Sequence, residues 1–112
     1  MQWIQLTEEE QLKQIVEKSK EKPQVIFKHS TRCSISALVL QRLQKAAQPQ
    51  EIDFYFLDLI RYRHLSNKIA EAFKVHHESP QALVIRDGQC VYHESHLGIS
   101  MEEIAETVHS NS

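Results

Sequence analysis

The stretch VIFKHSTRCSISALVLQRLQKAA (Val25–Ala47) joins a strand-like run to a helix-like run, and a cysteine lies at the junction. Val25–Phe27 is a short, continuous apolar run, typical of a strand that is buried on both faces. Beyond the cysteine, apolar residues recur every three or four positions, which predicts a helix with one buried side. We expect Ser30 or Thr31 to cap this helix. The stretch therefore predicts a β-loop-α unit with Cys33 in its loop.

The rest of the chain repeats this alternation of strand and helix. One helix is predicted before the first strand, one around residues 65–73, and one that runs through Val108. The further strands are predicted at Ile52–Leu57, Ala82–Ile85 and Cys90–His93. Asp87 and Gly88 separate the last two strands, and this pair favours a tight hairpin turn.

The predicted order of elements is α-β-α-β-α-β-β-α. Strand-helix-strand units give parallel strand pairs with right-handed crossovers, and the hairpin adds one antiparallel strand. We therefore predict an α/β chain with a four-stranded mixed sheet and helices on both faces. This is the arrangement of a thioredoxin-like fold.

Length and composition limit the classes of protein to which the chain can belong. We expect its 112 residues to form a single domain over 1–112, with 108–112 as a frayed tail. The net charge is −2 without a basic block, which argues against nucleic acid as a partner. The sequence has no apolar run of about 18 residues, so we expect no membrane span. The start of the chain turns acidic soon after Met1, unlike a secretory signal, so we expect a cytoplasmic protein.

Cys33 is the candidate nucleophile. The start of a helix carries a partial positive charge and free N–H groups, and both favour a thiolate over a thiol. Arg32 adds a positive charge beside it. The alternative is a buried, unreactive cysteine, but the polar neighbours between Ser30 and Ser36 argue against burial. In a reducing compartment we expect no structural disulfide between Cys33 and Cys90.

Ser36 occupies the place of the second cysteine in a Cys-x-x-Cys redox motif. Its hydroxyl either donates a hydrogen bond to the Cys33 thiolate or satisfies backbone groups in the first helical turn. In both cases Cys33 is limited to a monothiol route, because a serine cannot form the disulfide that releases a bound group. Cys90 is expected to be a sheet residue that faces a helix, with a resolving role as the alternative.

Pro80 precedes the third predicted strand in HESPQALV. Most X-Pro bonds are trans, but thioredoxin-like proteins have a cis proline at this place, facing the active cysteine. The predicted fold therefore predicts a cis Ser79–Pro80 bond. We expect the Ser79 backbone to pair with an extended substrate peptide, and Thr31 and Ser34 to line the same pocket.

Other polar residues give weaker signals. None of the seven histidines shows the paired spacing of a zinc site, so no metal is predicted. Four basic side chains near the predicted site are candidates to hold the carboxylates of a small thiol. They are Lys28, Arg32, Arg61 and Arg63. Ordinary solvated charge is the simpler interpretation for all of them except Arg32.

Three segments together resemble one family. KHSTRCSIS, HESPQALVI and YHESHLGIS are similar to the three signatures of the YtxJ-like family, the monothiol bacilliredoxins of the C type. The likeness runs from Trp3 to about Val108. The family motif has proline where this chain has Ser34, and the serine adds an N–H group near the sulfur.

The resemblance implies a thioredoxin fold with Cys33 as nucleophile. It also implies a thiol-disulfide oxidoreductase that removes bacillithiol from S-thiolated client proteins, without a bound cofactor. The small thiol is then a co-substrate, and a second thiol or an external reductase restores Cys33. Two alternatives stay open: an iron–sulfur cluster carrier of the monothiol glutaredoxin type, and a non-enzymatic thioredoxin-like binding module with an inert Cys33.

Overall fold

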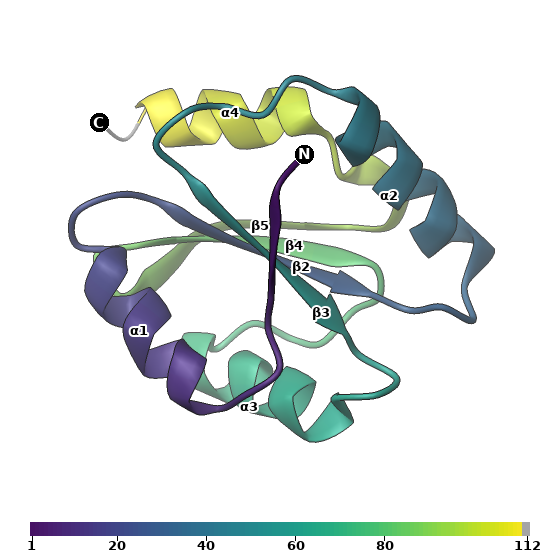
Figure 1. The fold of residues 1–112 in the computed structure, drawn as a ribbon, viewed down its shortest axis with the longest axis horizontal. Coiled ribbons are helices and arrows are strands. Elements are labelled where there is room, and N and C mark those ends of the chain that lie inside the picture. Colours follow the sequence, from purple (N-terminus) through teal and green to yellow (C-terminus); the bar gives the residue numbers. More distant parts are fainter. Residues whose placement is uncertain (111–112) are drawn as a thin grey trace.

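The computed structural model describes residues 1–110 and forms one five-stranded sheet with helices on both faces (Figure 1). The strands are β1 (Trp3–Gln5), β2 (Gln24–His29), β3 (Asp53–Asp58), β4 (Gln81–Arg86) and β5 (Gln89–Ser95). The helices are α1 (Glu10–Lys18), α2 (Ser34–Lys45), α3 (Arg63–Phe73), the short 3₁₀ helix η1 (His96–Gly98) and α4 (Met101–Ser110).

The strand order in the sheet is β1-β3-β2-β4-β5. β2 and β3 are parallel, whereas β4 runs antiparallel to both β2 and β5. The predicted mixed sheet is therefore confirmed, with β1 as a fifth strand that the sequence analysis did not predict. β1 has only three residues, too few for an alternating pattern, and it pairs with β3 alone.

Each face of the sheet has its own apolar core, because successive residues of a strand point to opposite faces. On β2, Ile26 packs with residues of α1 and α3, and Val25 and Phe27 pack with residues of α2 and α4. Figure 1 shows these helix pairs on opposite sides of the sheet. The continuous apolar run at the start of the quoted stretch thus supplies both cores.

Two expected helix boundaries are wrong. The N-cap residue of α2 is Cys33, not Ser30 or Thr31, so the helix begins directly after the cysteine. α4 continues to Ser110 and Val108 is buried, so residues 108–110 are not a frayed tail. Residues 111 and 112 of that predicted tail lie outside the described residues.

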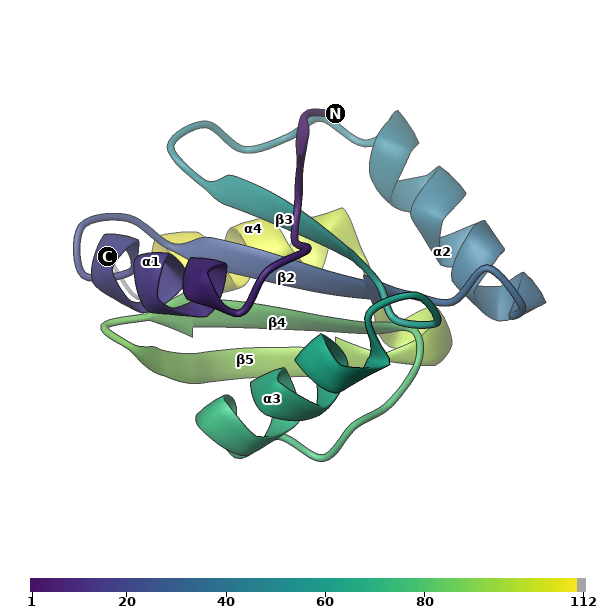
Figure 2. The ribbon, with the colours of Figure 1, turned by 60° about the horizontal axis from the view of Figure 1, so that its bottom comes forward.

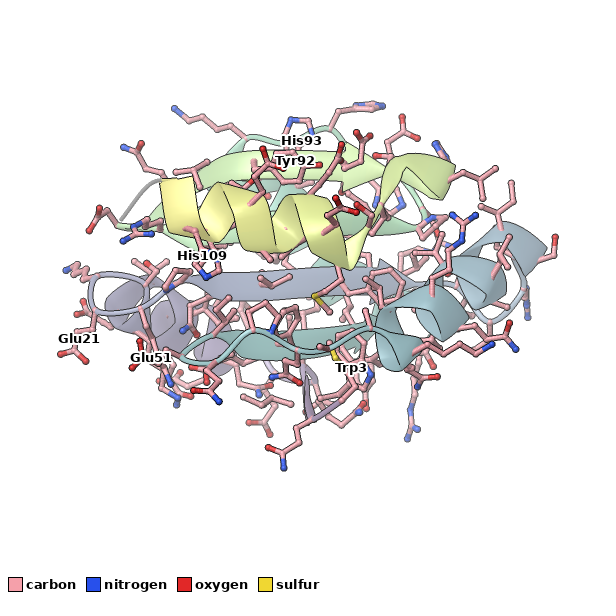
Figure 3. All side chains as sticks on the ribbon, turned by 90° about the horizontal axis from the view of Figure 1, so that it is seen from above. Trp3, Glu21, Glu51, Tyr92, His93 and His109 are labelled. Atoms are coloured by element: carbon pink, nitrogen blue, oxygen red, sulfur yellow. The ribbon has the colours of Figure 1, made fainter. Side chains whose placement is uncertain are left out.

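The hairpin between β4 and β5 has the predicted turn. Asp87 and Gly88 both have positive φ, of 53° and 76°, as a two-residue hairpin loop requires. Figure 3 shows Tyr92 on β5 beside α4. Its hydroxyl donates to Glu103 Oε2 of α4 at 2.7 Å and joins the two elements. None of the described helices is long and apolar enough to cross a membrane.

Candidate functional site

The connections that follow β2 and β3 and the one that precedes β4 gather at one end of the sheet (Figure 2). After β2 the chain makes a tight turn in which the Cys33 N–H donates to Ser30 O at 3.2 Å. The Arg32 N–H donates to Ser30 Oγ at 3.3 Å and steadies the same turn. Cys33 is partly exposed, and its neighbours Arg32 and Ser34 are exposed. Cys33 is therefore partly open to solvent at the start of α2.

Strand register brings the predicted proline to this turn. Lys28 on β2 pairs with Gln81 on β4 in an antiparallel register, so the residues just before Gln81 lie beside those just after Lys28. This register places Pro80 beside His29, at the turn that carries the cysteine. The Ser79–Pro80 bond is cis, as predicted, and Pro80 is buried.

The cis-proline loop, residues 74–80, is also held by His96, the residue that follows β5. The His96 N–H donates to Pro80 O at 2.9 Å, and the His96 side chain lies 3.6 Å from a Glu78 carboxylate oxygen. His96 has a positive φ of 56°, a conformation that histidine tolerates better than most residues. No local sequence pattern signals this contact, because it depends on how β5 ends beside the loop.

Ser36 does not have either of the two roles expected for it. It is fully buried, its Oγ accepts from the Ser30 N–H at 3.1 Å, and it lies 2.7 Å from His29 Nδ1. Ser36 therefore links α2 to the end of β2. Among the described residues, the Cys33 side chain makes no hydrogen bond.

His29 is a site residue that the sequence analysis missed. It is buried beside Phe27 and Phe56, with ring centroids 6.0 and 5.3 Å away. Burial lowers the pKa of His29, although the nearby Asp58 carboxylate acts in the opposite direction. A neutral imidazole at Nδ1 is thus the partner that the Ser36 hydroxyl meets. Strand alternation could have found it, since His29 lies two residues after the core residue Phe27.

Ser34 occupies the first position of α2, where the family motif has proline. Cys33 has φ −116° and ψ 119°, which is the extended conformation that residues before proline prefer. Ser34 itself is exposed, and in the described part of the chain its N–H donates no backbone hydrogen bond outside the helix.

We expect Ser34→Pro to fold normally and to raise the free energy of unfolding by roughly 0.4–1 kcal/mol, because proline restricts the unfolded chain at a compatible position. Urea unfolding of the two proteins measures this difference. A loss of stability would show that the turn requires the serine N–H group.

Cys90 lies at the far end of the sheet from Cys33. Cys90 pairs with Ile85, which in turn pairs with Gln24, the first residue of β2, whereas Cys33 follows the last. The length of β2 alone separates the two ends by roughly 17 Å, and a disulfide needs Cα atoms within about 7 Å. Cys90 is half-buried, its thiol donates to Tyr92 O at 3.3 Å, and burial raises the pKa of that thiol. The geometry therefore argues against a resolving role for it.

The four basic candidates separate into exposed and buried groups. Lys28 is fully buried, so the interpretation of this residue as solvated charge is wrong. Arg61 is exposed, and its guanidinium lies 5.5 Å from the centre of the Tyr62 ring. The Leu59 N–H donates to His29 O at 2.9 Å, which places the loop of Arg61 at the same end of the sheet as Cys33.

Comparison with known proteins agrees with this arrangement. The family model for monothiol bacilliredoxin BrxC matches residues 4–104. A solved structure described as an inferred oxidoreductase with a thioredoxin fold is 33% identical, with a TM-score of 0.81, and the match covers 93% of this chain and 91% of that one.

Thioredoxins are similar in fold at lower identity. The thioredoxin of Trypanosoma brucei brucei is 14% identical, with a TM-score of 0.74, and the match covers 98% of this chain and 90% of that one. The thioredoxin of Fasciola hepatica is 17% identical, with a TM-score of 0.71, and the match covers 96% of this chain and 98% of that one. The predicted thioredoxin-like fold is confirmed.

Proposed function

Because this chain belongs to the monothiol bacilliredoxin family, we propose that it removes a low-molecular-weight thiol of the bacillithiol type from S-thiolated client proteins. The family and the fold support a thiol oxidoreductase. The observation that carries the proposal is the environment of one sulfur. Cys33 is partly exposed at the start of α2, with the oxygen of Ser36 where a resolving sulfur would lie.

The proposed reaction is one thiol-disulfide exchange. The Cys33 thiolate attacks the small-thiol sulfur of the mixed disulfide, and a new S–S bond forms between Cys33 and the small thiol. The S–S bond to the client breaks, and the client leaves as a thiolate that takes a proton from solvent. A second thiol molecule or an external reductase then restores Cys33. Arg32 directly precedes Cys33, and Cys33 caps the start of α2, so both supply positive charge beside the reacting sulfur in this proposal.

The cis-proline loop supplies the binding edge for the client in this proposal. In the described part of the chain, the backbone N–H and C=O of Ser79 form no backbone hydrogen bond, whereas Pro80 O is already occupied by His96. Ser79 therefore offers the groups that an extended peptide needs for strand-like pairing. Thr31 and Ser34 are exposed and lie within two residues of Cys33, so in this proposal they contact the substrate beside the sulfur.

A release assay tests the proposed function. A client protein that carries a mixed disulfide with bacillithiol, or in a second arm with glutathione, is mixed with the reduced protein, and the free client thiol is measured over time. We expect the initial rate to rise in proportion to the protein concentration. Client thiol that appears no faster than without protein in both arms would refute the proposal.

A further inference from the structure

Lys28 is a buried cation without an anionic partner. Its side chain is fully buried on the face of the sheet that packs against α1 and α3. Its Nζ lies 3.3 Å from Ser66 O and 3.3 Å from His77 Nδ1. Among the described residues, no carboxylate lies within 4.0 Å of this nitrogen. A buried charge that has only neutral acceptors destabilises the folded state, so an apolar residue would serve the core better.

The groups that Lys28 contacts belong to the connection that carries the cis proline. This connection runs from Lys74 to Pro80 between α3 and β4. It is anchored at two consecutive residues: Lys28 meets the ring of His77, and Gln81 Nε2 donates to His76 O at 3.0 Å. Lys28 on β2 and Gln81 on β4 are register partners, so the two residues that hold the loop are neighbours in the sheet.

The contact also decides which nitrogen of His77 carries the proton. The ammonium of Lys28 can only donate, and the Ser66 hydroxyl lies 3.3 Å from the same Nδ1 atom. Nδ1 must therefore accept, which leaves the proton of the neutral ring on Nε2. A protonated Nδ1 would point its N–H at the ammonium.

Burial and most of the charges around the His77 ring favour its neutral form. Burial lowers the pKa of His77, and the charges of Lys28 and Arg63 lower it further, with His76 a smaller contribution and Glu78 acting in the opposite direction. Burial lowers the pKa of Lys28 to about 8, so at neutral pH the lysine is mostly charged and the histidine is neutral. Near pH 7 the pair therefore has one main hydrogen-bonded form, in which the charged Lys28 donates to the neutral His77 ring.

We propose that Lys28 is a positioning residue of the exchange site, which holds His77 as the Nε2–H tautomer and thereby fixes the loop that presents Ser79 and Pro80 beside the Cys33 turn. This inference rests on the proposed function. It assigns the buried charge a role in presenting the substrate-binding backbone, and it explains why a lysine occupies a core position of β2.

The first test determines which ring nitrogen of His77 carries the proton, and it needs no client protein. Long-range ¹H–¹⁵N NMR of the uniformly labelled protein shows which ring nitrogen of His77 bears the proton. We expect Nε2–H near pH 7 in the wild type. In Lys28→Met we expect the titration midpoint of His77 to move to higher pH, because the main nearby cation is gone. A proton on Nδ1 in the wild type, or an unmoved midpoint in the variant, would overturn the proposal.

The second test separates positioning from stability. In Lys28→Met we expect the client-release rate to fall by about tenfold, because small shifts of a positioning element are costly in rate. The urea midpoint should stay the same or rise, because a buried charge is removed. The matched control is Lys68→Met, which removes a partly exposed α3 lysine that lies 3.9 Å from Glu9 and should leave the rate unchanged. An unchanged rate, or a lower urea midpoint, in Lys28→Met would overturn the proposal.

Variants of His77 test the same contact from its other partner. His77→Asn places an amide oxygen near the position of Nδ1 and should retain most of the rate. His77→Leu removes the acceptor and should lose about as much as Lys28→Met, about tenfold. Equal rates in these two variants would contradict the proposal. A wild type that releases no client thiol would instead refute the proposed function, and the NMR result would still decide the geometry.

Discussion

Cys33→Ala is expected to lower the rate of client-thiol release by at least about 10³-fold, as removal of the nucleophile does in covalent catalysis. The physical reason is that the other cysteine thiol, Cys90, lies at the opposite end of the sheet and cannot replace Cys33. The initial rate of client-thiol release measures the effect. The matched control is Cys90→Ala, whose rate should stay within about twofold of the wild type, since distant sites act independently.

The opposite ranking of these two variants would contradict the account. If Cys90→Ala lost the activity and Cys33→Ala kept it, the exchange would occur at the half-buried thiol beside the hairpin. A full rate in both variants would show that the release does not use a protein thiol. Circular dichroism of both variants confirms that a lost rate is not a lost fold.

Ser36→Cys is expected to change the product of the reaction. Residues 33 and 36 lie across the first turn of α2, where Cβ atoms three residues apart are roughly 5–6 Å from each other. Cα separations of about 4.4–6.8 Å are compatible with a disulfide. The Ser36 oxygen lies 2.7 Å from His29 Nδ1, so a thiol placed there has a base within reach of its proton.

In this variant the introduced thiolate attacks the Cys33 sulfur of the mixed disulfide, and the small thiol leaves with the bonding electron pair. The protein is then oxidised to a disulfide between Cys33 and the sulfur introduced at position 36. Intact-mass analysis after reaction with the client should show the loss of two hydrogens and no small-thiol adduct. A lasting adduct on the variant would show that residue 36 cannot reach the sulfur of Cys33.

Much of this site follows from local patterns in the sequence. An apolar strand, a polar loop and a periodic helix predict the β2-α2 unit, and they place Cys33 at a helix start. The cis bond before Pro80 followed from the predicted fold and not from its neighbours, because X-Pro bonds are usually trans. The Asp87-Gly88 turn was predictable because few residue pairs adopt positive φ at two successive positions.

The contacts that the sequence analysis did not predict join segments far apart in the chain. A charged residue that follows an apolar run is usually exposed to solvent. Lys28 is nevertheless buried, because α3 and the loop of His77 cover it. Ser36 was expected to act on Cys33 or on first-turn backbone, but its hydroxyl meets His29, which depends on how α2 packs on β2. Local periodicity carries no information about these pairings.

The most direct test of the central claim is intact-mass analysis of the wild-type protein after reaction with a client carrying a bacillithiol mixed disulfide. The account predicts a single small-thiol adduct, located on Cys33 by peptide mapping and persistent until a second thiol or a reductase is added. An adduct on Cys90, a Cys33–Cys90 disulfide, or an unmodified protein beside a released client thiol would contradict it.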